Sequence, residues 1–202
     1  MSFYYVGESG SPFTYVAGGR GDLNADGSTT NDPIYIPRSA YDATEIRFSG
    51  VSDSVGADNS LGAKAARVRL QQDAFQRFIE GAPCLRRQRG QIMERNSCRE
   101  PWAHTTVASV RQAIPTPGRA LDVELQVFNV LNLLRSSCGL SRVTYGRSDV
   151  TATPPLLERV GRIGGTNATA QSEFRFEPTA PRWTTQPELS AYQLQLALRY
   201  RF

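Results

Sequence analysis

The sequence predicts an all-β fold, built on an antiparallel sheet of about four strands, and three observations carry this prediction. Apolar and polar residues alternate over Ala191 to Phe202, and again over a shorter run from Leu121 to Asn129. Alternation with a period of two is typical of a β-strand whose two faces have different surroundings. Two prolines and a glycine fill the segment from Ala113 to Arg119, which therefore predicts a tight turn.

The last segment of the chain shows the clearest strand pattern. A strand of about 9–11 residues crosses an outer membrane, and leucines flanked by aromatic residues are typical of a strand that faces lipid. A half-buried strand of a soluble sandwich is the alternative, but the length of the run and its two arginines disfavour it. The pattern predicts a lipid-facing row made of Tyr192, Leu194, Leu196, Leu198, Tyr200 and Phe202.

Three earlier segments complete the predicted sheet. The run from Leu121 to Asn129 places Leu121, Val123, Leu125 and Val127 on one face. A weaker run covers Trp102 to Gln112, with His104 near one end. Because only the proline-rich turn separates these two runs, we expect them to form an antiparallel hairpin. A fourth strand is expected around Phe3 to Val6.

Two long connections separate the predicted strands, one from about Gly18 to Pro101 and one from about Asn132 to Ser190. Loops of this length are uncommon in compact soluble domains. Bacterial outer-membrane barrels, however, combine short periplasmic turns with long extracellular loops. If the C-terminus lies on the periplasmic side, both connections are extracellular. The first is expected to contain a short helix, Val68 to Glu80, that packs within the loop and ends before Pro83.

Together these elements predict an antiparallel transmembrane β-barrel segment that covers residues 1–202. A closed membrane barrel needs about eight strands, and an open sheet edge in lipid leaves polar groups unpaired at several kcal/mol each. We therefore expect the chain to be the C-terminal part of a larger barrel. Met1 to Gly10 has neither the basic nor the long apolar region of an export signal, which predicts either a cytoplasmic chain or a start further upstream.

Composition argues against two other function classes. The net charge is +4, but the basic residues are scattered apart from Arg86, Arg87 and Arg89. Nucleic-acid binding needs a concentrated basic patch. The single histidine, His104, lies in a predicted strand with no nucleophile motif nearby. We therefore expect neither nucleic-acid binding nor catalysis, and we assign no catalytic residue.

Carboxylates occupy alternate positions on the shorter strand. Asp122 and Glu124 fall between its apolar residues and would face the barrel interior. Arg199 and Arg201 hold the equivalent positions on the last strand. Opposite charges on neighbouring strands stabilise a sheet, so we expect these carboxylates and arginines to pair across the barrel wall.

A calcium-loop pattern lies in the first long connection. Asp22, Asn24 and Asp26, followed by Gly27, match the spacing that converges oxygen ligands on Ca²⁺. The twelfth position of the loop is a proline, and the adjacent Asp32 would have to supply the missing ligand. The alternative is a turn rich in Asp, Asn and Gly that holds no metal. The tripeptide Arg20 to Asp22 reads RGD, which chance explains.

Two of the three cysteines, Cys84 and Cys98, lie in the same predicted loop. In an oxidising compartment they are expected to form a disulfide. Closing a loop of about 15 residues contributes roughly 3 kcal/mol in the chain-entropy model. Two free thiols are the alternative, and Cys138 would stay unpaired.

Several motifs resemble the TonB-dependent outer-membrane receptors, in the Oar-like branch that carries a carboxypeptidase-regulatory-like domain at its N-terminus. Gly19 to Pro37 resembles the family's GDxNxDG…NDxxYxP loop, and Arg89 to Trp102 resembles its RG…RN…PW segment. Phe128 to Leu133 resembles the FNVLN end of a strand. Arg199 to Phe202 is similar to the aromatic assembly signal at the end of outer-membrane barrels. Ser137 to Gly139 departs from the tryptophan–glycine that often follows in the family.

The resemblance implies a location in the bacterial outer membrane and the import of a scarce solute, energised through TonB. It also implies partners: membrane lipid, the remaining barrel strands, the plug, and TonB itself through an N-terminal part that this chain lacks. Apart from calcium, no cofactor is expected. The alternative from a different class is a secreted, calcium-stabilised β-sandwich that binds surface glycans or proteins.

Overall fold

The computed structural model describes residues 1–19, 22–24, 26–28, 31–116, 119–144, 155–164, 170–179 and 181–201. Most of its regular structure is β-strand, as the sequence predicts. The chain divides into two compact units. Residues 1–11, 100–143 and 183–202 form the sheet unit; residues 12–99 and 144–182 form the loop unit. Within the described ranges, no helix is long and apolar enough to cross a membrane.

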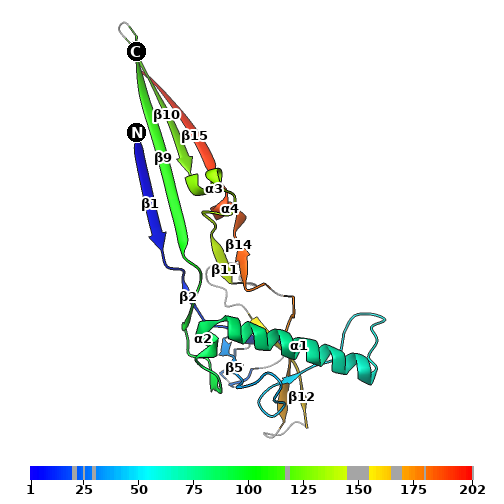
Figure 1. Ribbon diagram of the computed structural model, residues 1–202. Coiled ribbons are helices and arrows are strands. Elements are labelled where there is room, and N and C mark those ends of the chain that lie inside the picture. Colours follow the sequence, from blue (N-terminus) through cyan, green and yellow to red (C-terminus); the bar gives the residue numbers. More distant parts are fainter. Residues whose placement is uncertain are drawn as a thin grey trace. The chain divides into compact units, whose positions relative to one another are not determined.

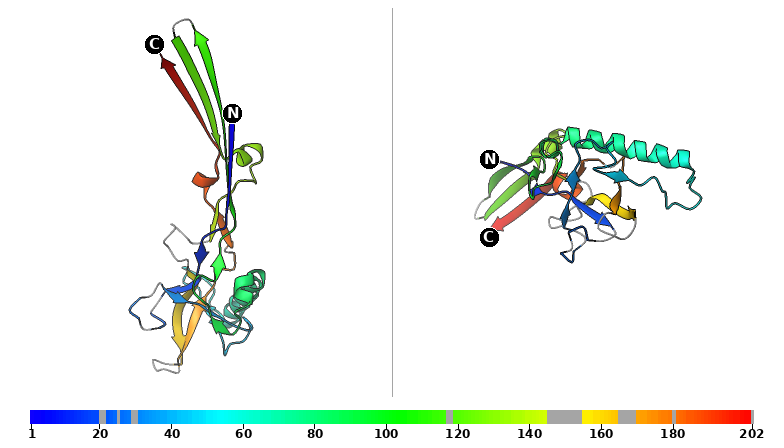
Figure 2. Two further views of the ribbon diagram at one scale, coloured as in Figure 1. Left: turned by 90° about the vertical axis from the view of Figure 1, so that its left-hand side faces the viewer. Right: turned by 90° about the horizontal axis from the view of Figure 1, so that it is seen from below.

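The sheet unit is built on an antiparallel meander of four strands. These are β1 (Ser2–Glu8), β9 (Ala103–Thr116), β10 (Arg119–Phe128) and β15 (Gln193–Arg201), and their spatial order follows their chain order. They lie side by side in Figures 1 and 2. Among the described residues no strand pairs with the outer edge of β1 or β15, so the sheet is open and forms no closed barrel.

The hairpin between β9 and β10 is tighter than predicted. The expected turn began at Ala113, but β9 continues through Pro115 to Thr116, and its residues from Val107 to Thr116 pair with β10. Proline is tolerated in a strand that has a neighbour on one side only. The pairing of β1 with β9 ends at Ser109, so the later part of β9 meets this condition.

A short supporting layer joins β10 to β15. It contains α3 (Val130–Leu134), β11 (Arg142–Thr144), which pairs with β14 (Trp183–Thr185), and α4 (Pro187–Ser190). Asn129 ties these pieces together. Its Nδ2 atom donates to the carbonyls of Gly139, at 2.8 Å, and Ser190, at 2.6 Å. Asn129 has a φ of 52°, a conformation that asparagine adopts more readily than most residues. The first asparagine of the FNVLN motif therefore has a structural role.

Gly139 is required for this arrangement. Its φ of 63° is unfavourable for other residues, and a Cβ atom there would collide with the Asn129 side chain. We expect Gly139→Ala to open the connection locally at a cost of about 1–3 kcal/mol. Trypsin should then cleave after Arg135, which is exposed, faster than it does in the unchanged chain. Gly56→Ala is the control, because Gly56 also has a positive φ but nothing lies within 4 Å of its added methyl group. Equal cleavage rates in both variants would contradict this role for Gly139.

The loop unit corrects the prediction of two separate long loops. A five-stranded sheet runs in the order β4 (Asp32–Pro33), β3 (Val16–Gly19), β12 (Pro155–Ile163), β13 (Gln171–Arg175) and β6 (Arg47–Phe48). β3 pairs with β12, and β13 with β6, both in parallel. Each of these pairs joins one connection to the other, so the two connections fold together as one body. Two further small sheets pair β2 (Pro12–Phe13) with β8 (Cys98–Arg99) and β5 (Tyr35–Ile36) with β7 (Gln91–Ile92).

Helix α1 (Leu61–Gly81), followed by the short α2 (Pro83–Arg86), packs on the core of the loop unit (Figure 1). Phe75 is fully buried, with ring centroids 5.6 Å from Phe48 and 5.1 Å from Phe176. The helix begins seven residues before the predicted start at Val68. Ser60 caps it by accepting a hydrogen bond from the backbone of Ala63. The added turns contain good helix formers without apolar periodicity, so the amphipathic pattern did not reveal them.

Candidate functional site

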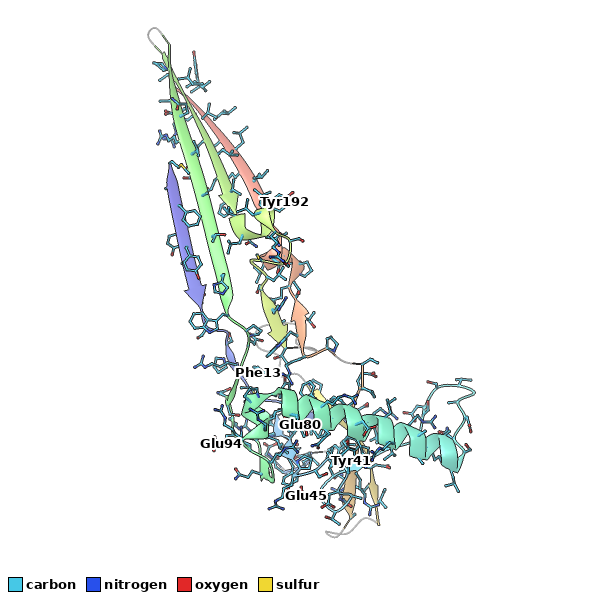
Figure 3. The ribbon with its side chains drawn as sticks, viewed as in Figure 1. Phe13, Tyr41, Glu45, Glu80, Glu94 and Tyr192 are labelled. Atoms are coloured by element: carbon cyan, nitrogen blue, oxygen red, sulfur yellow. A yellow bond between two sulfur atoms is a disulfide. The ribbon has the colours of Figure 1, made fainter. Side chains whose placement is uncertain are left out.

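One face of the four-stranded sheet is largely apolar and exposed. On β15, Leu194, Leu196 and Leu198 are between 61% and 65% exposed. The row is bounded by Tyr200 and by Tyr192, which precedes the strand and is labelled in Figure 3. Large contiguous apolar patches are rare on soluble proteins and mark sites of interaction with protein or membrane. The row therefore needs a non-aqueous neighbour. Phe202, the last residue predicted for this row, lies outside the described residues.

The apolar surface extends across the neighbouring strands. The register places Leu196 opposite Leu125 on β10, and Leu125 opposite Val110 on β9. Leu125 and Val110 are themselves exposed. Further along, Phe3 on β1 is exposed and pairs with Ala108 of β9. All four strands thus contribute to the same apolar face.

Aromatic side chains gather at one end of β1 and β9. The Tyr5 hydroxyl lies 2.9 Å from Nδ1 of His104, and the two rings stack with centroids 6.0 Å apart. The Trp102 ring also stacks with the histidine, with centroids 6.5 Å apart. Tyr and Trp are enriched where a membrane protein passes from lipid to water. His104 is therefore held between aromatic rings and by the hydrogen bond with Tyr5.

The opposite face of the sheet is polar around Asp122, whereas Tyr4, Val107 and Phe128 make it apolar toward the other end of the strands. Asp122, only 4% exposed, forms an ion pair with Arg111 at 3.0 Å between Nη2 and Oδ2. The predicted partner, Arg199, is its register neighbour on β15, whereas Arg111 on β9 was not expected. The side chain of Arg201 lies outside the described residues. Across β1, the hydroxyls of Ser2 and Ser109 hydrogen-bond at 2.8 Å. Along β10 and β15, up to Gln126 and Gln195, the sheet therefore separates an apolar face from a polar and charged one, as strand alternation predicts.

The predicted calcium loop is folded by its own hydrogen bonds. Asp22 accepts from the backbone amides of Asn24, at 3.1 Å, and Gly27, at 2.6 Å. Asn24 accepts from the amide of Asp26 at 3.0 Å. Asp32 accepts from the Leu23 amide at 2.8 Å. Such bonds from Asp and Asn side chains to nearby amides form Asx turns.

These hydrogen bonds are those of a turn rich in Asp and Asn, which is the alternative to a calcium site. Within the described ranges, no three His, Cys, Asp or Glu side chains lie close enough together to hold a metal ion. The calcium site formed by Asp22, Asn24, Asp26 and Asp32 therefore stays a prediction. Arg20 and Gly21 of the RGD tripeptide lie outside the described residues.

The loop makes stability depend on pH in a defined direction. The pKa of Asp26 is lowered, first by the Ser28 amide and then by the side chains of Asn31 and Asn24. A lowered pKa means that this stabilisation is complete above the unfolded value near 3.8 and is lost as pH falls through the folded value. We expect the Ser28 amide resonance to titrate with a midpoint below 3.8. Asp26→Asn should abolish this titration; a midpoint above that value would contradict the assignment.

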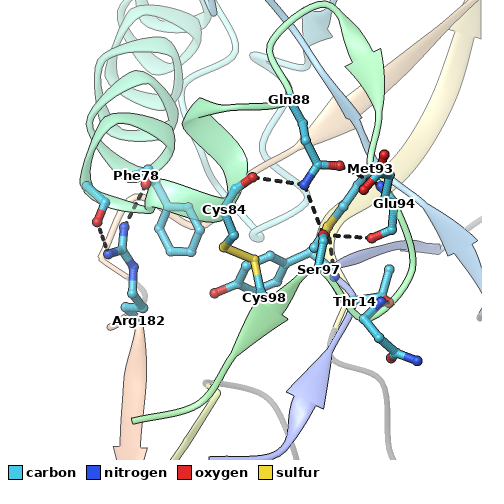
Figure 4. Close-up of a disulfide and its surroundings, with 12 residues drawn as sticks. Thr14, Phe78, Cys84, Gln88, Met93, Glu94, Ser97, Cys98 and Arg182 are labelled. Carbon is cyan, nitrogen blue, oxygen red and sulfur yellow. Dashed lines mark hydrogen bonds between the residues drawn. A yellow bond between two sulfur atoms is a disulfide. The ribbon is translucent and has the colours of Figure 1, made fainter.

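A disulfide closes one side of the loop unit. Cys84 of α2 and Cys98 of β8 are bonded, with their Cα atoms 5.3 Å apart (Figure 4). Gln88 packs beside the bridge and donates from Nε2 to the Cys84 carbonyl and to the Ser97 hydroxyl, both at 2.9 Å. Cys138, in the sheet unit, is a free thiol.

Residues of two sequence motifs meet in the loop unit. Arg89 donates from Nη1 to the carbonyl oxygens of Pro37, at 3.2 Å, and Arg38, at 2.7 Å. Gly90 donates its amide to the Ile36 carbonyl at 2.6 Å. The NDxxYxP and RG segments are thus neighbours in space although about fifty residues separate them in the sequence.

The loop unit also contains a cavity of about 410 Å³, called here the loop-unit cavity. Its described lining includes Ala17, Ile34 and Ile46 from the first connection and Leu157 and Phe174 from the second. Sequence reasoning missed it, because its walls come together only when the two connections pair. No local pattern in either connection signals such a site.

Comparison with protein-family models, with curated proteins and with solved structures gave no match to this chain. The link to TonB-dependent receptors therefore rests on the sequence motifs.

Proposed function

We propose that the chain is the C-terminal segment of the barrel of a TonB-dependent outer-membrane receptor, which binds a scarce solute and imports it. The single observation that carries this proposal is the two-faced meander. One face exposes leucines such as Leu194, Leu196 and Leu198, while the other carries an ion pair between the buried Asp122 and the half-exposed Arg111. Lipid outside and a polar interior satisfy both faces at once.

The open edges of the sheet support the need for further strands. The outer edges of β1 and β15 have no strand partner in the described part of the chain. In lipid, each unpaired backbone group costs several kcal/mol. In this proposal the remaining barrel strands of the receptor pair with both edges, and its plug fills the interior that Asp122 and Arg111 face.

The direction of the chain supports a role for the loop unit in solute capture. The residues between β1 and β9, and between β10 and β15, leave the sheet at the end opposite the β9–β10 turn. Outer-membrane barrels have short turns on the periplasmic side and long loops outside. The loop unit is then extracellular and meets the solute first, and TonB acts from the periplasmic side.

Fractionation of the cells that make this protein tests the proposal. We expect an antibody against the loop unit to stain the outer-membrane fraction. Its band in a gel should migrate differently in unheated and boiled samples, because folded membrane barrels resist the detergent in the gel. Staining confined to the aqueous fraction, with one mobility in both samples, would exclude a membrane receptor and favour a secreted binding module.

A further inference from the structure

The loop-unit cavity has the size and lining of a small-molecule site. Its volume of about 410 Å³ lies in the range of ligand pockets, roughly 300–1,000 Å³. Most of the described lining is apolar, with Leu157 and Phe174 from one connection facing Ile34 and Ile46 from the other. Such a lining favours a ligand with an apolar body.

Two charged residues, Asp32 and Glu45, belong to the described lining, and both are carboxylates. Asp32 is 2% exposed; its Oδ2 accepts from the Leu23 amide, while its Oδ1 has no hydrogen-bond partner among the described residues. A buried carboxylate oxygen without a partner is costly unless a positive charge lies nearby. No described lining residue is a lysine or an arginine.

The second carboxylate, Glu45, is already neutralised. Its Oε2 accepts from the backbone amide of Arg38 at 2.6 Å, and its Oε1 forms an ion pair with the Arg38 guanidinium at 2.8 Å (Glu45 is labelled in Figure 3). Within the described ranges, Asp32 forms no ion pair. The described part of the cavity wall therefore carries about one uncompensated negative charge, which attracts cations and repels anions.

We propose that the loop-unit cavity binds a small solute that has an apolar body and one cationic group, such as a primary ammonium. The apolar body fills the space between Phe174 and Ile34, and the cation balances the charge of Asp32. Binding of such a solute to the cavity does not depend on the proposed function. That the receptor imports this solute rests on the function proposed above.

Three isosteric indoles test the charge preference: tryptamine, a cation; tryptophol, neutral; and indole-3-acetate, an anion. Saturation-transfer NMR with the full chain in detergent micelles, corrected with empty micelles, gives their relative affinities. We expect tryptamine to bind about tenfold or more tightly than indole-3-acetate, with tryptophol between them. Absence of binding by all three, or equal binding of cation and anion, would overturn the proposal.

Two arginine variants locate the binding. Ile92 lines the cavity and is 65% exposed, so Ile92→Arg adds a positive charge there without disturbing the core. We expect it to weaken tryptamine binding about tenfold or more. Val55→Arg is the matched control, because Val55 is fully exposed in the same unit and does not line the cavity. If both variants bind tryptamine like the unchanged chain, the site lies elsewhere and the proposal fails.

The binding experiment and the fractionation experiment test the two proposals separately. Membrane fractionation reports on the sheet unit, whereas the indole series reports on the loop unit. A chain that is absent from membranes but prefers tryptamine would keep the cavity and lose the receptor. A chain that is found in the outer membrane but binds the three indoles without charge preference would keep the receptor and lose the proposed cation site.

Discussion

Leu196→Arg should impair assembly of the sheet into the outer membrane by about 2–4 kcal/mol, the cost of an arginine on the lipid face of a barrel at the bilayer midplane. Leu196 lies at the centre of β15, is 64% exposed and pairs with Leu125 of β10. Its neighbours on this face are apolar, so no carboxylate there can balance the new charge. The measurement is the fraction of protein that shows heat-dependent gel mobility in urea-titrated outer-membrane extracts.

Gln195→Arg is the control for this substitution. Gln195 is the adjacent residue, but it points to the polar face, where it pairs in register with Gln126. An arginine there joins a surface that already contains Arg111 and Asp122. We expect little change in assembly. Equal losses in the two variants would count against the assignment of faces, and a loss in Gln195→Arg alone would reverse it.

The strands of the sheet unit were predictable because the patterns that specify them lie within short stretches of the sequence. Alternating residues fix which side of a strand each side chain takes, so the faces of Leu196 and Asp122 follow from the sequence. The short turn between β9 and β10 sets their pairing, since adjacent antiparallel strands need only a tight connection. The limits of the strands were less certain: Pro115 marked a turn by composition and instead lies within β9.

The loop unit was not predictable from local patterns. β4 and β6 contain two residues each, too few to show any period. β3 and β12 pair in parallel across more than one hundred residues, and no turn geometry links them. Two connections in which no strand was predicted therefore form one sheet, because each supplies hydrogen-bond partners for the other.

The candidate sites divide in the same way. A disulfide between Cys84 and Cys98 was expected because both thiols lie in one connection. The ion pair of Asp122 with Arg111 depends on the register between β9 and β10, where the weaker alternation gave no guide. The loop-unit cavity depends on the pairing of both connections, so neither Leu157 nor Phe174 carries a signal by itself.

Removal of the disulfide should lower the stability of the loop unit by roughly 3 kcal/mol, since the bridge closes a loop with a sequence separation of 14 residues. The variant is Cys84→Ser with Cys98→Ser. The effect should concentrate between α2 and β8, where Gln88 hydrogen-bonds around the bridge. Hydrogen exchange in this segment is the measurement, because it reports local opening without requiring the whole chain to unfold.

Cys138→Ser is the matched control, because it removes a thiol that takes no part in the bridge. It should leave exchange in the loop unit unchanged, whereas a reducing agent should bring the unchanged chain to the level of the double variant. Leu85 next to the bridge is fully buried, and the aromatic core around Phe75 holds α1 independently of it. If exchange rises throughout the core rather than near the bridge, the disulfide is required for the whole loop unit to fold, and its contribution exceeds that of loop closure alone.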